Sequence, residues 1–218
     1  MDKSGFFNSQ TVAIVGLGLM GGSLALGLRG QCHEVLAVDP DPDTQELALR
    51  QGIIAQISAD PAEIIPQADI IFLAAPVNVI LDFIPRLPVL HPGNPVIIDL
   101  GSTKNQICEA FNKLPARFEP LGGHPMCGKA VGGLEHAEAE LFQDTPFAFT
   151  PLARTTERAL EIADHLATIL RAQALWVGPK THDQWVAATS HFPYLLATAL
   201  TLSTPGEASH LVGPGFKS

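Results

Sequence analysis

The chain has 218 residues, 46% of them hydrophobic, which is enough to bury the core of one large domain or of one domain plus part of another. Its net charge of −9 argues against nucleic acid or an anionic membrane as the main partner, because phosphate binding needs clustered Lys and Arg. The first residues lack the regions of a signal peptide, and no apolar run reaches the ~18 residues that a membrane span needs. The net charge does not argue against a small anionic ligand, which a local cationic pocket can hold.

Three cysteines, Cys32, Cys108 and Cys127, lie far apart in the chain and show no spacing typical of a metal site. An odd number of isolated cysteines is more typical of a reduced setting than of a disulfide framework. We therefore predict a cytoplasmic protein without a bound metal.

Short apolar runs alternate with segments of helical length as far as residue 177. The runs cover residues 11–15, 34–38, 69–74, 95–100, 118–121, 146–150 and 174–177. The early runs are apolar at nearly every position, which is typical of strands buried on both faces of a parallel sheet. The helical segments include residues 43–51, 78–87, 104–114 and 155–171. This alternation predicts an α/β fold with a doubly wound, parallel-type Rossmann sheet.

The pattern changes after residue 178, because residues 179–202 carry apolar side chains at helical spacing. Pro193 lies within this segment, and we expect it to kink a single long helix. The predicted domains are a Rossmann domain over residues 1–178 and the start of an all-helical domain over residues 179–218.

The predicted 179–202 helix has more apolar surface than a lone exposed helix tolerates, since it carries Trp185, Phe192, Leu195 and Leu196. In this chain that surface must find a partner or aggregate. We therefore expect the parent protein to be a homodimer through its helical domain.

The sequence of residues 16–21, GLGLMG, matches the GxGxxG motif of dinucleotide-binding proteins. It follows an apolar strand and opens a helix rich in small residues, which is the context that the motif requires. The first glycine permits a tight turn, the second lets backbone approach a pyrophosphate, and the third allows close helix–strand packing. The alternative is a glycine-rich turn without a ligand. The residues predicted to bind the cofactor here are Gly16, Gly18, Leu19, Met20 and Gly21.

Asp39 closes the second predicted strand, 18 residues after Gly21, where an acidic residue hydrogen-bonds the adenosine ribose hydroxyls of NAD. Its neighbours Asp41 and Asp43 are also acidic, and no Arg or Lys follows before Arg50. A 2′-phosphate would meet repulsion there, so we predict NAD rather than NADP. The alternative for Asp39 is a turn or helix-cap residue, although Asp43 is the better candidate for the cap.

Several conspicuous segments follow the predicted strands, at the rim where doubly wound sheets bind their ligands. Ala75 and Pro76 follow the 69–74 run, and we expect them beside the cofactor. Ser102, within the GSTK sequence, and His124, within GGHPM, are expected near the nicotinamide. A histidine beside a hydroxyl substrate and NAD suggests a base that takes the hydroxyl proton as hydride leaves.

Each of these polar residues also has a structural alternative. His124 could be a satisfied structural histidine, and Ser102 could be the N-cap of the 104–114 helix. A second candidate, His191 in the TSHFP sequence, could be a buried histidine at a helix kink. The remaining histidines are predicted to be structural only: His33, His91, His136, His165, His182 and His210.

The chain resembles the prephenate/arogenate dehydrogenase family of tyrosine biosynthesis over nearly its whole length. The family's motifs occur here in the family's order: the glycine loop at 16–21, GSTK at 101–104, GGHPMxG at 122–128, TSHFP at 189–193 and GFKS at 215–218. The GGHPMxG and SHxP motifs together are specific to this family, whereas the dinucleotide loop is generic.

The resemblance implies a role for each matching residue. His124 would accept the hydrogen bond of the substrate's ring hydroxyl and so promote hydride transfer. Ser102 would hydrogen-bond both His124 and that hydroxyl. His191 would contact the substrate from the helical domain, and Lys217 would lie in the segment that holds the family's anion-binding residues.

The resemblance also implies an arginine, a few residues beyond the GFKS segment, that grips a substrate carboxylate. The chain stops at Ser218, before that position, so we expect a C-terminally truncated chain. Prephenate and arogenate differ at the side-chain end of the molecule, which residues beyond Ser218 partly contact. Both compounds therefore stay as alternative substrates.

The expected activity is NAD-dependent oxidative decarboxylation, which would convert prephenate to 4-hydroxyphenylpyruvate or arogenate to tyrosine. One alternative is a β-hydroxyacid dehydrogenase or an imine reductase. Enzymes of these classes generally use a lysine on the helical domain or lack the GGHP sequence. Lys180 is the only candidate here for such a lysine. A third reading is a regulatory module that binds NAD without turnover.

Overall fold

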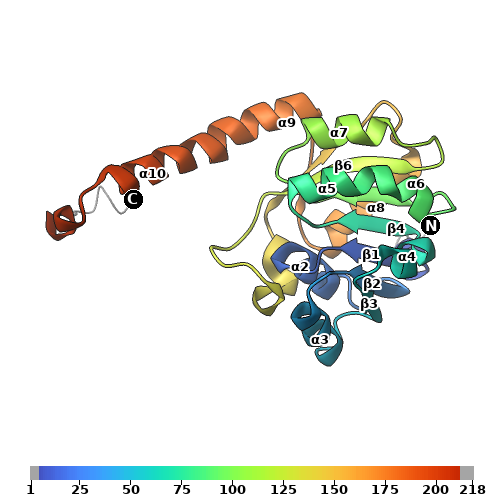
Figure 1. Ribbon diagram of the computed structural model, residues 1–218. Coiled ribbons are helices and arrows are strands. Elements are labelled where there is room, and N and C mark those ends of the chain that lie inside the picture. Colours follow the sequence, from blue (N-terminus) through green and yellow to red (C-terminus); the bar gives the residue numbers. More distant parts are fainter. Residues whose placement is uncertain (1–4, 212–218) are drawn as a thin grey trace. The chain divides into compact units, whose positions relative to one another are not determined.

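The computed structural model describes residues 5–211, which divide into two compact units between His182 and Asp183 (Figure 1). The first unit contains one eight-stranded sheet in the order β3-β2-β1-β4-β5-β6-β7-β8. Its strands are β1 (Thr11–Val15), β2 (Glu34–Val38), β3 (Gln56–Ser58), β4 (Ile70–Leu73), β5 (Val96–Asp99), β6 (Glu119–Pro125), β7 (Pro146–Thr150) and β8 (Gln173–Trp176).

Helices connect the strands and continue into the second unit. The α-helices are α1 (Gly5–Asn8), α2 (Leu19–Gly27), α3 (Pro42–Arg50), α4 (Pro61–Ile64), α5 (Val77–Phe83), α6 (Leu87–Leu90), α7 (Asn105–Asn112), α8 (Glu157–Ile169), α9 (Pro179–Val186) and α10 (Phe192–Ser203). Short 3₁₀ turns are η1 (Ile65–Gln67), η2 (Ile84–Arg86), η3 (Leu134–His136), η4 (Ala139–Phe142) and η6 (Gly206–Leu211), and η5 (Ala187–His191) is a π-helix.

The sheet is parallel from β3 to β6 in its spatial order, which confirms the predicted doubly wound Rossmann sheet. β7 runs antiparallel to β6, and β8 runs parallel to β7. The strand order reverses direction beside β1, which leads into the glycine-rich loop and α2. Ligands of open α/β sheets bind at such a switch point.

Apolar side chains of each strand alternate between two cores, one on each face of the sheet. Ile70 and Phe72 of β4 pack into the core that α2 and α8 cover, whereas Ile71 and Leu73 pack into the core that α5 and α7 cover. Because both faces are buried, the central strands are apolar at nearly every position, as the sequence predicted for the early runs.

Two features of the first unit differ from the prediction. β3 is a strand of three residues at the sheet edge that the sequence analysis missed. The predicted 78–87 helix is divided into α5, η2 and α6, because Pro85 and Pro88 lack the N–H that a continuous α-helix needs.

The second unit contains the end of α9, the π-helix η5, and α10, so the helical segment predicted over 179–202 is present. Pro193 lies at the start of α10, where its missing N–H coincides with the change from π to α hydrogen bonding. Among residues 5–211 the structure contains no helix that is long and apolar enough to cross a membrane.

Candidate active site

The carboxyl ends of neighbouring parallel strands lie along one rim of the sheet. Val15 at the end of β1 pairs with Val38 of β2 and with Leu73 of β4, and Leu73 pairs with Asp99 of β5. β6 continues the same register on the other side of β5. The glycine-rich loop, Asp39 and the segments after β4 and β5 therefore start from adjacent positions.

The glycine-rich loop is packed so closely that two of its glycines admit no side chain. Gly16 has a φ of 91°, and a Cβ there would lie 2.7 Å from the carbonyl oxygen of Ala74. A Cβ on Gly21 would collide with the carbonyl oxygen of Gly16. These glycines let the chain turn tightly from β1 into α2.

Gly18, the middle glycine of the loop, lies at an open helix end. Gly18 is the N-cap of α2. Within residues 5–211 no side chain caps this helix, and a Cβ on Gly18 would meet no atom within 4 Å. The first N–H groups of the helix, including those of Leu19 and Met20, have no partner within a helix. Such an end fits the pyrophosphate of a dinucleotide, because its N–H groups and helix dipole both favour negative charge.

Asp39 directly follows β2 and is nearly buried. Its Oδ2 accepts a hydrogen bond from the backbone N–H of Leu17 at 2.7 Å, and its Oδ1 accepts one from the N–H of Asp41 at 3.0 Å. A carboxylate oxygen has more than one acceptor site, so these bonds leave capacity for ribose hydroxyls. The same carboxylate thus ties the glycine-rich loop to the end of β2.

The residue that caps α3 is Asp41, so the prediction of Asp43 is wrong. Asp41 Oδ2 accepts from the backbone N–H of Thr44 at 3.2 Å and from its hydroxyl at 2.6 Å. The cause is the proline at the first helical position, which makes the residue before it the N-cap. Hydrogen bonding by Thr44 lowers the pKa of the Asp41 carboxyl.

Two further segments predicted to bind ligands follow β4 and β5. Ala75 and Pro76 come after β4, and Pro76 is the N-cap residue of α5. Ser102 lies in the loop after β5 with an exposed side chain. The alternative that Ser102 caps the next helix is wrong, because α7 begins at Asn105 with Lys104 as its N-cap residue.

His124 lies on a strand and not in the loop that the sequence predicted for residues 122–126. β6 pairs with β5 up to Leu121 and then continues as far as Pro125 by pairing antiparallel with β7. In this register His124 is opposite Ala148, and its side chain is half-buried. Ladder hydrogen bonds therefore hold the backbone of this histidine more firmly than a loop would.

The two glycines before His124 are required by close contacts on both sides of the strand. A Cβ on Gly122 would collide with the hydroxyl of Thr150. A Cβ on Gly123 would lie 2.6 Å from the carbonyl oxygen of Asp99. The glycine pair thus lets β5, β6 and β7 approach closely at the rim.

A fully buried ion pair between Asp99 and Lys104 lies directly under this strand. The Lys104 ammonium also donates to the carbonyl oxygen of Gly123 at 2.6 Å. Asp99 accepts from the backbone N–H groups of Gly101 at 2.9 Å and Gly123 at 3.2 Å. Burial raises the pKa of Asp99, while Lys104 and the two N–H groups act in the opposite direction. These contacts fix the backbone at Gly101, close to Ser102, and at Gly123, just before His124.

The imidazole of His124 contacts a second histidine. His124 Nδ1 lies 2.9 Å from Nε2 of His182, and the ring planes meet at 66° with centroids 5.1 Å apart. His182 belongs to α9 and is only 2% exposed. The contact with His182 engages Nδ1, one of the two ring nitrogens of His124.

The other two predicted substrate residues lie elsewhere. His191 is the last residue of the π-helix in the second unit and is exposed, so the alternative of a buried histidine is wrong. Single π-helical turns occur frequently at functional sites. Lys217 lies outside the described residues.

Sequence reasoning missed three residues of this site: Asp99, Lys104 and His182. Asp99 and Lys104 had a usable signal, because a charged residue at the end of a buried strand needs a partner of opposite charge. No sequence signal indicated His182, because its contact with His124 joins residues far apart in sequence and depends on where α9 packs.

Residues 5–211 also contain metal-ligating side chains and the three cysteines. No group of His, Cys, Asp and Glu in residues 5–211 could hold a metal ion. Burial raises the pKa of Cys32 to about 11 and also raises the pKa of Cys127. A thiol with a raised pKa is a poor nucleophile at neutral pH.

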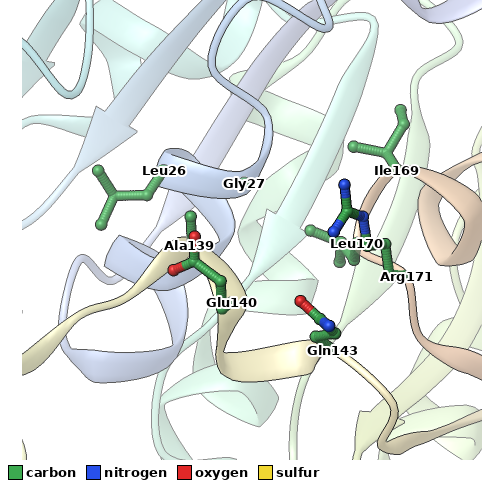
Figure 2. A pocket seen from close by; sticks show the side chains of 8 residues that line it. All are labelled: Leu26, Gly27, Ala139, Glu140, Gln143, Ile169, Leu170 and Arg171. Atoms are coloured by element: carbon green, nitrogen blue, oxygen red, sulfur yellow. The ribbon is translucent and has the colours of Figure 1, made fainter.

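A pocket of about 210 Å³ lies at the other end of α2 from the glycine-rich loop (Figure 2). It is lined by Leu26 and Gly27 of α2, by the 3₁₀ turn η4 and by the end of α8 around Arg171. Because α2 separates it from Gly18, this pocket does not belong to the rim described above.

Comparison with known proteins gives a consistent result. The family model described as "Prephenate dehydrogenase, nucleotide-binding domain" matches residues 24–175. The chain is 31% identical to a prephenate dehydrogenase of Lactococcus lactis over 95% of this chain and 59% of that protein. The chain spans little more than half the length of the curated relatives that it matches.

Solved structures agree with the sequence comparison. The crystal structure of prephenate dehydrogenase from A. aeolicus in complex with hydroxyphenyl propionate and NAD+ superposes with a TM-score of 0.87 at 28% identity, covering 95% of this chain and 76% of that one. Synechocystis arogenate dehydrogenase gives a TM-score of 0.82 at 31% identity with the same coverage. The chain belongs to the prephenate dehydrogenase family and carries its nucleotide-binding domain.

Proposed function

We propose that the protein oxidises the ring hydroxyl of prephenate or arogenate with NAD and releases the ring carboxylate as CO₂. The observation that carries the proposal is the half-buried His124 on a clamped strand at the same rim as the glycine-rich loop. Family membership supports it, since relatives include a prephenate and an arogenate dehydrogenase.

The cofactor would be held at the β1–α2 turn. Gly16, Gly18 and Gly21 form the turn, the open end of α2 would receive the pyrophosphate, and Asp39 would accept the ribose hydroxyls. Ala75 and Pro76 would line the same cleft from the end of β4. NAD supplies the hydride acceptor when it is bound. The prephenate dehydrogenase of A. aeolicus, which was crystallised with NAD+, supports this choice.

His124 would take the hydroxyl proton while the carbon that carries the hydroxyl gives up its hydride. The two losses leave a ketone that is linked through the ring's double bonds to the carbon that bears the carboxylate. The carbon–carboxylate bond then breaks and CO₂ leaves. The bonding electrons move through the ring to the ketone oxygen and give an aromatic phenolate, which takes a proton back from His124 and becomes the phenol. Because aromatisation drives this second step, the protein mainly has to orient the substrate and accept one proton.

Three other residues would orient the substrate in this proposal. Ser102 would hydrogen-bond the same hydroxyl as His124, which its exposed position in the clamped loop after β5 allows. His191 of the π-helix and Lys217 would contact the substrate's anionic groups. The acting protein would be a homodimer through its helical domain.

The proposal is tested by NADH formation with the complete gene product. Prephenate and arogenate are supplied in turn with NAD or NADP, and the products are identified by mass spectrometry as 4-hydroxyphenylpyruvate or tyrosine. We expect turnover of at least one substrate with NAD. Tight NAD binding without turnover of either substrate would instead indicate a regulatory module, and oxidation of β-hydroxyacids would indicate the other dehydrogenase class.

A further inference from the structure

The first turn of α9 presents a histidine to the rim. His182 is 2% exposed and belongs to the first unit, as His124 does. A buried imidazole needs hydrogen-bond partners, and Nε2 of His182 lies 2.9 Å from Nδ1 of His124. The rings meet edge to face, so the contact joins one nitrogen to another instead of stacking two ring faces.

In a hydrogen bond between two ring nitrogens one nitrogen donates its proton and the other accepts it, and each direction requires a different pair of tautomers. If His124 Nδ1 donates, then Nε2 of the same ring has a lone pair and can accept a proton. His182 must then carry its own proton on Nδ1 and present Nε2 as the acceptor. The reverse arrangement would leave His124 Nε2 protonated and unable to act as a base.

The backbone of His124 is already fixed by other contacts. Strand pairing places it opposite Ala148, and the Asp99–Lys104 pair holds both the N–H and the carbonyl of Gly123. The freedom that is left is rotation of the imidazole about its side-chain bonds. A nitrogen partner at 2.9 Å removes this freedom as well.

We propose that His182 is a positioning residue, which holds His124 in the tautomer protonated on Nδ1 and directs Nε2 toward the substrate hydroxyl. This inference rests on the proposed function of His124. When Nε2 takes the hydroxyl proton, the resulting imidazolium keeps donating from Nδ1 to His182. A base whose orientation depends on a third group is a recurrent arrangement in catalysis.

Two variants separate this role from a packing role. His182→Leu keeps an apolar side chain of similar bulk but removes the acceptor, and His182→Gln offers an amide oxygen near the position of Nε2. In the complete gene product we expect His182→Leu to lower kcat about 10- to 100-fold, the usual effect of losing a hydrogen bond to a charged group. KM and the Kd for NAD should change less than about twofold, and His182→Gln should recover most of kcat.

His136→Leu is the matched control, because His136 is exposed and lies in the 3₁₀ turn η3. It should leave kcat unchanged. Wild-type kcat in His182→Leu, or a loss of kcat that His182→Gln does not recover although that variant is folded, would overturn the proposal.

A second measurement does not depend on turnover. The ¹⁵N chemical shifts of the imidazoles in the 218-residue chain report which nitrogen of His124 is protonated. We expect the Nδ1-protonated tautomer in the wild type and a mixture in His182→Leu. A wild-type His124 protonated on Nε2 would overturn the inference even if the leucine variant failed to fold. The expected tautomer without turnover of either substrate would contradict the proposed function alone.

Discussion

At the residue scale, Asp39 has two roles. Its carboxylate accepts a hydrogen bond from the N–H of Leu17 in the glycine-rich loop, and it is proposed to accept the ribose hydroxyls of NAD. We expect Asp39→Ser to weaken NAD binding about 10- to 100-fold, the effect of losing hydrogen bonds to a charged group. Adding Pro40→Arg should supply a cation for a 2′-phosphate and shift the preference toward NADP. Titration of both cofactors against protein fluorescence measures the change.

Asp43→Ser is the control for Asp39, because Asp43 is an exposed neighbour whose charge is screened by solvent. Its effect on either affinity should stay within about twofold. Wild-type protein that binds NADP as tightly as NAD would contradict the role assigned to Asp39.

The Asp99–Lys104 pair has a predictable effect on stability, because both side chains are completely buried. Lys104→Met leaves the Asp99 carboxylate without its partner and should lower the free energy of unfolding by about 3–5 kcal/mol. Urea denaturation followed by circular dichroism measures this loss.

Lys129→Met is the matched substitution for Lys104→Met, since Lys129 pairs with Glu138 at the surface, where their exposures are 26% and 58%. Exposed pairs contribute at most about 1 kcal/mol. Equal losses of unfolding free energy in the two variants would show that the buried pair stabilises the protein no more than a surface pair does.

At the residue scale, the sequence predicts those parts of the site that follow a strand directly. Gly16, Asp39 and Ser102 each stand next to a buried run, so sheet topology alone brings them to one rim. His182 could not be predicted in this way, because its contact with His124 requires the packing of α9 against the end of β6.

At the element scale, the long buried strands were predicted because both faces of the sheet are covered and leave a continuous apolar run. β3 was missed because it has three residues, lies at the sheet edge and contains a polar glutamine, Gln56. The extension of β6 to Pro125 was missed because glycine is unfavourable in strands, and here Gly122 and Gly123 are required by close neighbours.

The prediction of self-association rests on exposed apolar side chains of α10. Phe192, Leu195 and Leu196 are each more than half exposed. An apolar surface of this kind is typical of an interface. We expect the complete gene product to be a homodimer in light scattering, and Leu195→Glu combined with Leu196→Lys to shift it to monomer.

Val89→Glu is the control for the α10 variant, because Val89 is 90% exposed in the first unit and outside the predicted interface. This substitution should leave the molar mass unchanged. A wild-type protein that is monomeric at all concentrations would contradict the dimer prediction.

At the scale of the whole molecule, the order of strands and motifs identifies both the fold and the family, and the comparisons confirm them. Prephenate and arogenate share the ring hydroxyl on which His124 is proposed to act, whereas Lys217, which is proposed to contact an anionic group, lies outside residues 5–211. The central claim that can be tested within the described rim is therefore the role of His124.

The most direct test of that claim compares the wild type with His124→Asn in the complete gene product, measuring kcat and the Kd for NAD. Asparagine keeps a polar side chain but cannot accept the hydroxyl proton, so kcat should fall by about 10²–10⁴. The Kd for NAD should change little, because the pyrophosphate and ribose contacts are assigned to the glycine-rich loop and Asp39. Near-normal kcat in the variant would contradict the account and direct attention to His191, whereas simultaneous loss of NAD binding would mean that His124 is structural.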